Sequence, residues 1–337
     1  MSTENKGYID VFKFIFSILI IMLHTHFLYS TGTGYHYFSL GLLRLAVPFF
    51  FVCSGYFFAR KIYNKQSEIK IITKEYIKRL AIPLVFWLIV GLITSEFVNN
   101  YNGNILETIV FFIKKIVFYP WGALWYIFAL IVSIFILSKF YQKNKYVEPV
   151  LVGFFLYLFA LICNSYYFVI SNNGYIKMIV DSYLDFCFTA RNGLFVGLLF
   201  VSLGGLLYKL REEKKIFNTR SNIFYFVCCY MILLFEITII RKNITADDSS
   251  LFFILPFLSF FLVSILTRKS TKKNYLILRK LSISLYLLHR PMLGIFNTYL
   301  KIDYGNKLFI LVFSSTLIIS LIVIKINNKY INKLFMI

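Results

Sequence analysis

Three ionisable residues, Asp10, Lys13 and His24, fall on one face of the first apolar segment of the chain. In an α-helix, Lys13 and His24 would differ by about 20° in azimuth and by roughly 16 Å along the axis. Asp10 precedes Lys13 by three residues and shares that face. A histidine exchanges a proton near neutral pH. His24 lies in an apolar segment on the same face as a carboxylate and a cation, so it marks a candidate site for proton transfer.

The stripe also has a structural interpretation. Asp10 and Lys13 can pair with each other near a membrane edge, with the Lys13 side chain extended toward water. His24 can then be a hydrogen-bonded residue of the interface. His26 projects about 200° around the helix from His24, so we expect it at the outer interface.

Further polar residues also occur within apolar segments, where they usually face the protein interior or a wet cavity. The candidates for substrate or cavity contacts are Ser54, Arg191, Asn192, Glu236 and His289. Glu236 needs a cation, a proton or a water-filled cavity, so it either pairs to join two helices or contacts substrate. His289 lies two residues before Pro291 and can instead cap or kink its helix.

The composition indicates which elements position these residues. Hydrophobic residues make up 59% of the 337 positions and charged residues 15%, whereas a soluble domain carries roughly 25% charged residues. A helix needs about 20 apolar residues to cross the hydrocarbon core. The sequence therefore predicts an all-α, polytopic membrane bundle of about ten transmembrane helices, as a single domain over residues 1–337. The expected spans are 9–29, 39–59, 80–98, 122–139, 147–170, 191–208, 222–240, 251–267, 281–300 and 307–325.

The net charge of +21 is concentrated in alternate loops. These loops are 60–79, 139–145, 209–220 and 268–280, together with the tail 325–333. The positive-inside rule places them in the cytoplasm, and with them both termini of a multi-pass plasma-membrane protein. Because the basic residues follow the loops, the charge does not indicate nucleic-acid binding. The stretch 105–119 is interrupted by Lys114 and Lys115 and is expected to be interfacial or re-entrant.

The cysteines and serines exclude two classes of site. Five cysteines lie in apolar stretches without the spacing of metal ligands, so we expect free buried thiols and no metal. The sequence also lacks a Gly-x-Ser-x-Gly elbow, which argues against a hydrolase-type serine nucleophile.

Several motifs together resemble the acyltransferase family 3 membrane proteins. They are Asp10-Val-Phe-Lys13 followed by His24, the aromatic stretch 47–56 that ends in Ser-Gly-Tyr, Lys78-Arg79-Leu-Ala-Ile-Pro83, Leu124-Trp-Tyr126, and Ser282-Ile-Ser-Leu-Tyr-Leu-Leu-His289-Arg-Pro291. The resemblance covers residues 8 to about 325. The family more often has arginine at the Lys13 position; lysine keeps the charge but lacks the planar fork.

This resemblance implies transfer of an acyl group, usually acetyl, from cytoplasmic acyl-coenzyme A to a hydroxyl of an envelope glycan or a small molecule. O-acetylation of a polysaccharide is one such reaction. A hydroxyl is a poor nucleophile and needs a general base, for which His24 is the candidate, with Asp10 and Lys13 ordering the cytoplasmic mouth. Coenzyme A is expected as a co-substrate rather than a resident cofactor. Its phosphates need a cationic dock, and Lys74, Lys78 and Arg79 are suitably placed for that role.

A narrower resemblance supports an alternative function. Residues 188–195, the helix around Glu236 and residues 249–256 are similar to the membrane half of vancomycin-resistance serine racemases, a half associated with serine uptake. The sequence up to Ile337 contains no racemase half, so no pyridoxal-phosphate chemistry is expected. The alternative is a transporter for a small solute such as an amino acid, in which Arg191, Asn192 and Glu236 bind a zwitterion. Inverted repeats, which many transporters contain, are not visible.

Overall fold

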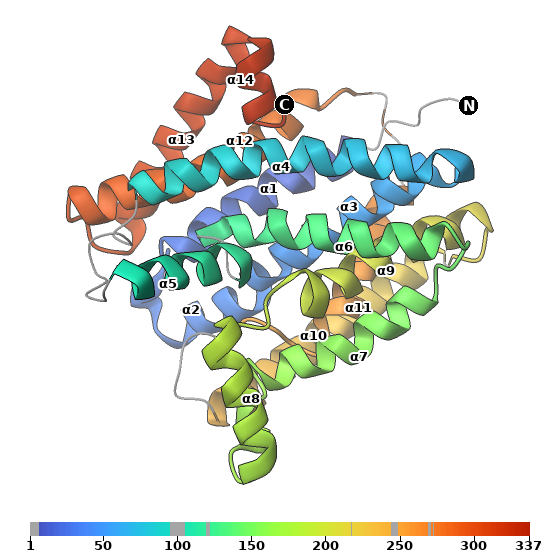
Figure 1. Cartoon of the computed structure of the whole chain (residues 1–337), viewed down its shortest axis with the longest axis horizontal. Helices are drawn as coiled ribbons and strands as arrows, with labels where there is room; N and C mark the ends of the chain where they lie inside the picture. The colour runs from blue at the N-terminus through green and yellow to red at the C-terminus, as the bar shows by residue number, and fades with distance from the viewer. Residues whose placement is uncertain are drawn as a thin grey trace. The chain divides into compact units, whose positions relative to one another are not determined.

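The computed structural model describes residues 7–94, 105–118, 122–216, 218–243, 249–268, 271 and 273–337. Every regular element in these ranges is helical, as the composition predicts (Figure 1). The chain divides into two compact units. The first comprises residues 1–46, 78–125 and 269–337, and the second comprises residues 47–77 and 126–268.

The first unit gathers helices from both ends of the chain. They are α1 (Gly7–His24), α2 (Thr33–Tyr37), the larger part of α4 (Ile69–Thr94), α5 (Ile105–Phe118), α12 (Leu276–Gly294), α13 (Asn306–Ile326) and α14 (Lys329–Leu334). A buried apolar cluster joins α1, α12 and α13 through Ile21, Leu285, Leu293, Leu308 and Val312. This cluster fixes α1, which carries Asp10, Lys13 and His24, against α12, which carries His289.

The second unit contains the central helices of the sequence. They are α3 (Ala46–Ile62), α6 (Trp125–Tyr141), α7 (Glu148–Ile162), α8 (Gly174–Cys187), α9 (Leu198–Glu212), α10 (Thr219–Asn243) and α11 (Leu255–Arg268). Helices α3 and α9 touch backbone to backbone: a Cβ on Gly55 would overlap the carbonyl of Val201, and one on Gly204 would overlap the carbonyl of Val52. The glycine of the Ser-Gly-Tyr motif therefore permits close helix packing.

Six stretches of the described chain are long and apolar enough to cross a membrane. They are Gly7–His24, Thr33–Ile62, Gly122–Tyr141, Gly193–Glu212, Thr219–Asn243 and Asn306–Ile326. Helices α7 and α11 are apolar but shorter, and the two remaining expected spans coincide with α4 and α12. Residues 95–98 of the expected span 80–98 lie outside the described ranges. The membrane-protein class is thus supported, while the count of ten and the cytoplasmic termini remain predictions.

Helix α5 covers the stretch that contains Lys114 and Lys115. Its 14 residues reach about 21 Å, short of the roughly 30 Å hydrocarbon core. The expectation of an interfacial or re-entrant helix is compatible with this length.

Candidate functional site

Helices α1 and α12 run parallel and side by side within the first unit. Arg279 donates two hydrogen bonds to Asp10, from Nε to Oδ1 at 2.9 Å and from Nη2 to Oδ2 at 2.8 Å. The Ser282 hydroxyl donates to the carbonyl oxygen of Lys13 at 3.0 Å. Both pairs are separated by 269 residues, so the two helices advance in the same direction. This course agrees with the predicted topology, in which both helices leave the cytoplasmic side.

The bidentate partner of Asp10 was not identified from the sequence. Asp10 is 3% exposed, and its charge is balanced by Arg279, whose side chain is 48% exposed. A fork-to-carboxylate pair is among the stronger charged hydrogen bonds and fixes orientation as well as distance. The sequence hypothesis paired Asp10 with Lys13. Arg279 was hidden among the basic residues of the loop before α12, which were assigned only to topology.

Farther along the same two helices, His24 meets consecutive residues of α12. The His24 and His289 rings stack with centroids 5.3 Å apart and planes inclined by 24°. The Arg290 Nη1 atom lies 3.5 Å from His24 Nδ1. Asp10 and His24 therefore both face α12, and the polar stripe expected on α1 lies along one helix pair.

The hydrogen-bonding chemistry of these groups sets the state of each imidazole. A guanidinium can only donate, so His24 Nδ1 accepts from Arg290 in the tautomer that carries a lone pair on this nitrogen. A carbonyl oxygen can only accept, so His289 Nδ1, at 2.6 Å from the Tyr286 oxygen, carries a proton. His289 is fully buried. Its Nε2 atom has no hydrogen-bond partner among the described residues.

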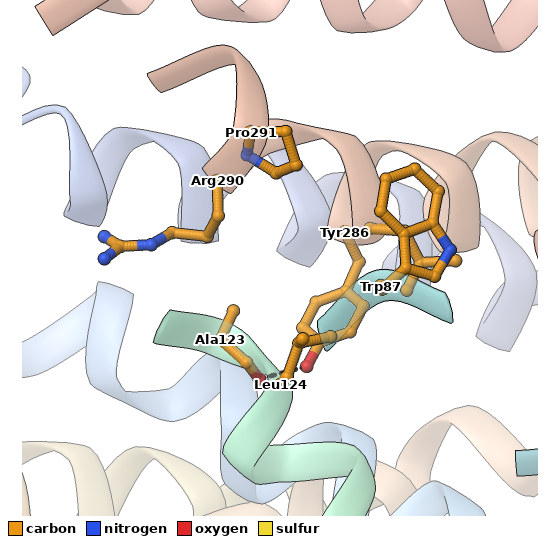
Figure 2. Close-up of a pocket in the computed structure, with 7 residues that line it drawn as sticks. Trp87, Ala123, Leu124, Tyr286, Arg290 and Pro291 are labelled. Atoms are coloured by element: carbon orange, nitrogen blue, oxygen red, sulfur yellow. Dashed lines mark hydrogen bonds between the residues drawn. The ribbon is translucent and has the colours of Figure 1, made fainter. Parts of the chain in front are cut away.

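A small pocket adjoins this cluster. Its lining residues are Trp87, Ala123, Leu124, Tyr286, Leu287, Arg290 and Pro291. The Tyr286 hydroxyl donates to the Ala123 carbonyl across it. In Figure 2 the Arg290 side chain points away from Trp87, so its stem borders the apolar pocket while its guanidinium extends elsewhere.

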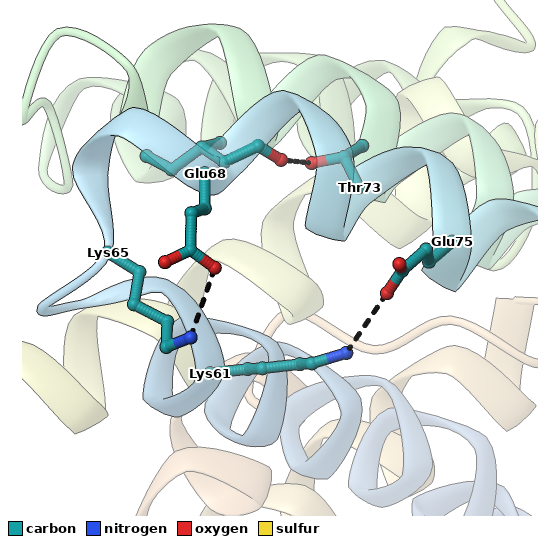
Figure 3. Close-up of polar contacts among 6 residues, drawn as sticks. Lys61, Lys65, Glu68, Thr73 and Glu75 are labelled. Carbon is teal, nitrogen blue, oxygen red and sulfur yellow. Dashed lines mark hydrogen bonds and ion pairs between the residues drawn. The ribbon is translucent and has the colours of Figure 1, made fainter.

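The expected donor-binding cations lie on α4. Lys74, Lys78 and Arg79 are all exposed, and among the described residues no carboxylate pairs with them. Acidic neighbours are held by other lysines: Lys61 pairs with Glu75 at 3.9 Å and Lys65 with Glu68 at 3.0 Å, as Figure 3 shows. The three cations on α4 are thus available to an anion.

Ser54 belongs to the second unit. Its hydroxyl lies 3.1 Å from the Tyr126 hydroxyl, and either atom can donate. The ring of Tyr126 also packs against Phe51, with centroids 4.5 Å apart. Ser54 therefore takes part in the packing of α3 against α6.

Glu236, also in the second unit, is held by neutral donors. Its carboxylate accepts hydrogen bonds from the Tyr166 hydroxyl and from the backbone amides of Phe253 and Ile254. These amides precede α11, so Glu236 caps the entry to that helix. The sequence offered a buried ion pair as one role for Glu236. Among the described residues, the contacts of this carboxylate are these neutral donors instead.

Arg191 and Asn192 lie in the same unit with different partners. Arg191 Nη1 lies 3.4 Å from the Ser250 hydroxyl, where it donates. The Asn192 side-chain oxygen accepts from the amides of Leu194 and Phe195, at 3.0 Å each, and so caps the turn that leads into α9. The roles of all these residues in substrate binding stay predictions.

Known proteins similar to this chain include three enterococcal relatives. An amino-acid racemase of Enterococcus faecalis is 27% identical over 209 residues, which is 61% of this chain and 29% of the relative. A serine/alanine racemase of Enterococcus gallinarum is 25% identical over 295 residues, 85% of this chain and 40% of the relative. A second amino-acid racemase of Enterococcus faecalis is 22% identical over 333 residues, 95% of this chain and 46% of the relative. The chain spans less than half the length of these relatives.

No solved structure matches the chain. The family comparison gives a positive result that agrees with the motifs. The model Acyl_transf_3, described as an acyltransferase domain, matches residues 6–325. Because this match covers nearly the whole sequence, the chain belongs to the Acyl_transf_3 family of acyltransferase domains.

Proposed function

We propose that this protein is a plasma-membrane acyltransferase that moves an acyl group, acetyl in the first instance, from cytoplasmic acyl-coenzyme A to a hydroxyl of an envelope glycan or small molecule. The observation that carries the proposal is the meeting of His24 with His289 and Arg290 inside an apolar helix pair. A neutral imidazole can take the proton of the acceptor hydroxyl, and a cation nearby can stabilise the negative charge that develops on the thioester oxygen.

In this mechanism His24 is the general base. The acceptor oxygen attacks the thioester carbonyl carbon as its proton passes to His24 Nδ1, and the carbon–sulfur bond then breaks. The coenzyme A thiolate leaves and takes up the proton from His24. The Asp10–Arg279 pair holds the first turns of α1 and α12 together, and Lys13 adds a cation on the same helix.

The donor nucleotide is proposed to bind at Lys74, Lys78 and Arg79. Coenzyme A carries several phosphates, and charge-assisted hydrogen bonds from exposed cations suit them. Lys78 and Arg79 follow Lys74 by one helical turn on α4, so one phosphate group can contact more than one of the three side chains.

Inside-out membrane vesicles test the activity directly, because they present the cytoplasmic face and contain the cell's own acceptors. Vesicles with this protein, given acetyl-coenzyme A labelled in the acetyl group, should place label in envelope material as an ester released by mild alkali. Vesicles with His24→Ala, or without the protein, should not. Equal labelling in all three preparations would refute the proposal.

A second candidate, transport of a small solute such as serine, is favoured by one observation. The similar enterococcal proteins are named as amino-acid and serine/alanine racemases. The polar group formed by Arg191 and Ser250 supplies a cation and a hydroxyl at which an amino acid can bind. Accumulation of labelled serine by proteoliposomes without an acyl donor, lost in Arg191→Gln, would favour transport.

A further inference from the structure

Arg290 has contacts that suit a reacting group rather than a surface cation. It lies on α12, within the expected span 281–300, where a charge is costly unless a function or a partner retains it. Its stem borders the pocket and its guanidinium points away from Trp87 (Figure 2). The guanidinium Nη1 atom reaches to 3.5 Å from His24 Nδ1. A cation therefore lies beside the nitrogen that would receive the acceptor proton.

Gly122 makes room for this side chain. A Cβ on Gly122 would lie 2.7 Å from Arg290 Nε, closer than real Cβ contacts allow. The backbone of Gly122 also has φ +58°, in the left-handed region that glycine adopts without a steric cost. The missing side chain leaves the space that Arg290 Nε occupies, and a larger residue at position 122 would require the Arg290 side chain to shift. The short helix that Gly122 opens, Gly122–Leu124, also supplies two pocket residues.

His289 positions the His24 ring, which is the group that the Arg290 guanidinium contacts. Its ring is oriented by the Nδ1–H bond to Tyr286 and stacks on His24. Since His289 and Arg290 are neighbours on α12, one covers the face of the His24 ring and the other meets its edge. This arrangement fixes the relative position of the base and the cation before substrate arrives, which is the requirement for electrostatic stabilisation of a transition state.

We propose that Arg290 is a second catalytic residue, which donates to the thioester carbonyl oxygen as negative charge develops on it. The proposal rests on the acyltransferase function proposed above. As the acceptor oxygen bonds to the carbonyl carbon, the carbonyl π electrons move onto oxygen, and Arg290 donates to that oxygen instead of to His24 Nδ1. The lone pair of His24 Nδ1, released from Arg290, takes the acceptor proton. When the carbonyl re-forms, the carbon–sulfur bond breaks and the thiolate leaves with that proton. Arg290 itself exchanges no proton, because a guanidinium stays charged.

The test uses the same inside-out vesicles, with initial rates of ester formation measured over a range of acetyl-coenzyme A concentrations. Arg290→Gln should lower kcat by about 10²–10³ while the KM for acetyl-coenzyme A changes by less than about threefold, because loss of an oxyanion donor affects the transition state. Arg290→Lys keeps the charge without the fork and should fall between the two. Gly122→Ala should lower kcat by displacing Arg290. Arg220→Gln, a surface change at the start of α10, should match the wild type.

Chemical rescue separates this role from a structural one. Millimolar guanidinium chloride should raise the rate of ester formation by Arg290→Ala at least about tenfold. It should not change the rate of His24→Ala, since only the first variant lacks a guanidinium. A well-folded Arg290→Gln protein with kcat within threefold of the wild type would overturn the assignment. So would a loss confined to KM, or an unrescued Arg290→Ala. If wild-type vesicles form no ester, the proposed function fails and this inference fails with it.

Discussion

Glu236 in the second unit and the cluster of His24, His289 and Arg290 in the first unit place ionisable groups in apolar surroundings by different means. In the second unit, the Glu236 carboxylate is occupied by a tyrosine hydroxyl and two backbone amides that lead into α11. In the first unit, His24, His289 and Arg290 lie against one another, and His289 Nε2 has no hydrogen-bond partner among the described residues. A buried polar group whose hydrogen bonds go to backbone amides supports the fold, whereas one left unsatisfied calls for another explanation. On this ground the proposed chemistry belongs to the first unit, whereas the hydrogen bonds of Glu236 support the fold of the second.

The largest effect is expected at His24. His24→Ala and His24→Gln should each lower acyl transfer by about 10²–10⁴, because neither side chain can act as a general base near neutral pH. The measurement is ester formation in inside-out vesicles, normalised to the amount of inserted protein. His26→Ala is the matched control: His26 follows α1, is exposed, and packs against Tyr304 with ring centroids 4.9 Å apart. Near-normal transfer by a folded His24→Gln protein would move the base to His289 or Glu236.

The next effect concerns the donor and tests whether the first unit also binds coenzyme A. Replacing Lys78 and Arg79 together by alanine should raise the KM for acetyl-coenzyme A by tenfold or more, since each charge-assisted hydrogen bond contributes about 1.5–3 kcal/mol. The value of kcat should change little. The shift should shrink as salt is raised, because screening weakens contacts at an exposed site. An unchanged KM would leave both residues with a topological role only.

Sequence reasoning located the long apolar helices and the polar stripe for a physical reason, but it did not predict α8 (Gly174–Cys187) between two expected spans. Apolar length and loop charge are set by the membrane itself, so each expected span overlaps a helix of the structure within the described residues. The 100° step of a helix likewise placed Asp10 and His24 on one face, and both contact α12.

The partners across helices could not be predicted in the same way. Arg279 pairs with Asp10 from 269 residues away, and nothing local distinguishes it from the other cations of its loop. In the sequence analysis Arg290 was only one residue of the motif 282–291. Its closeness to His24 and to the backbone of Gly122 arises from the packing of three segments. The backbone donors to Glu236 could not be predicted either, because almost every residue type has a backbone amide and the sequence does not show which amides face a carboxylate.

A smaller effect, on stability rather than rate, is expected at Glu236. Glu236→Ala removes the acceptor of two backbone amides and one hydroxyl, and each donor left buried without a partner costs about 1–3 kcal/mol. Thermal unfolding of purified protein should therefore move to lower temperature. The rate of transfer per folded molecule should stay near the wild-type value. A large loss of kcat without loss of stability would contradict the division between the two units.

The smallest effect tests whether Ser54 belongs to the architecture of the second unit or to a substrate cavity. Its hydrogen bond to Tyr126 at 3.1 Å is neutral, and such bonds contribute about 0.5–1.5 kcal/mol to stability. A double-mutant cycle with Ser54→Ala and Tyr126→Phe should recover a coupling free energy of that size from thermal unfolding, because each change removes the same bond and little else. Transfer by all three variants should stay within about threefold of the wild type. A coupling near zero, together with a strong loss of transfer in Ser54→Ala alone, would show instead that the hydroxyl contacts substrate. The region assigned to architecture would then contain part of the active site.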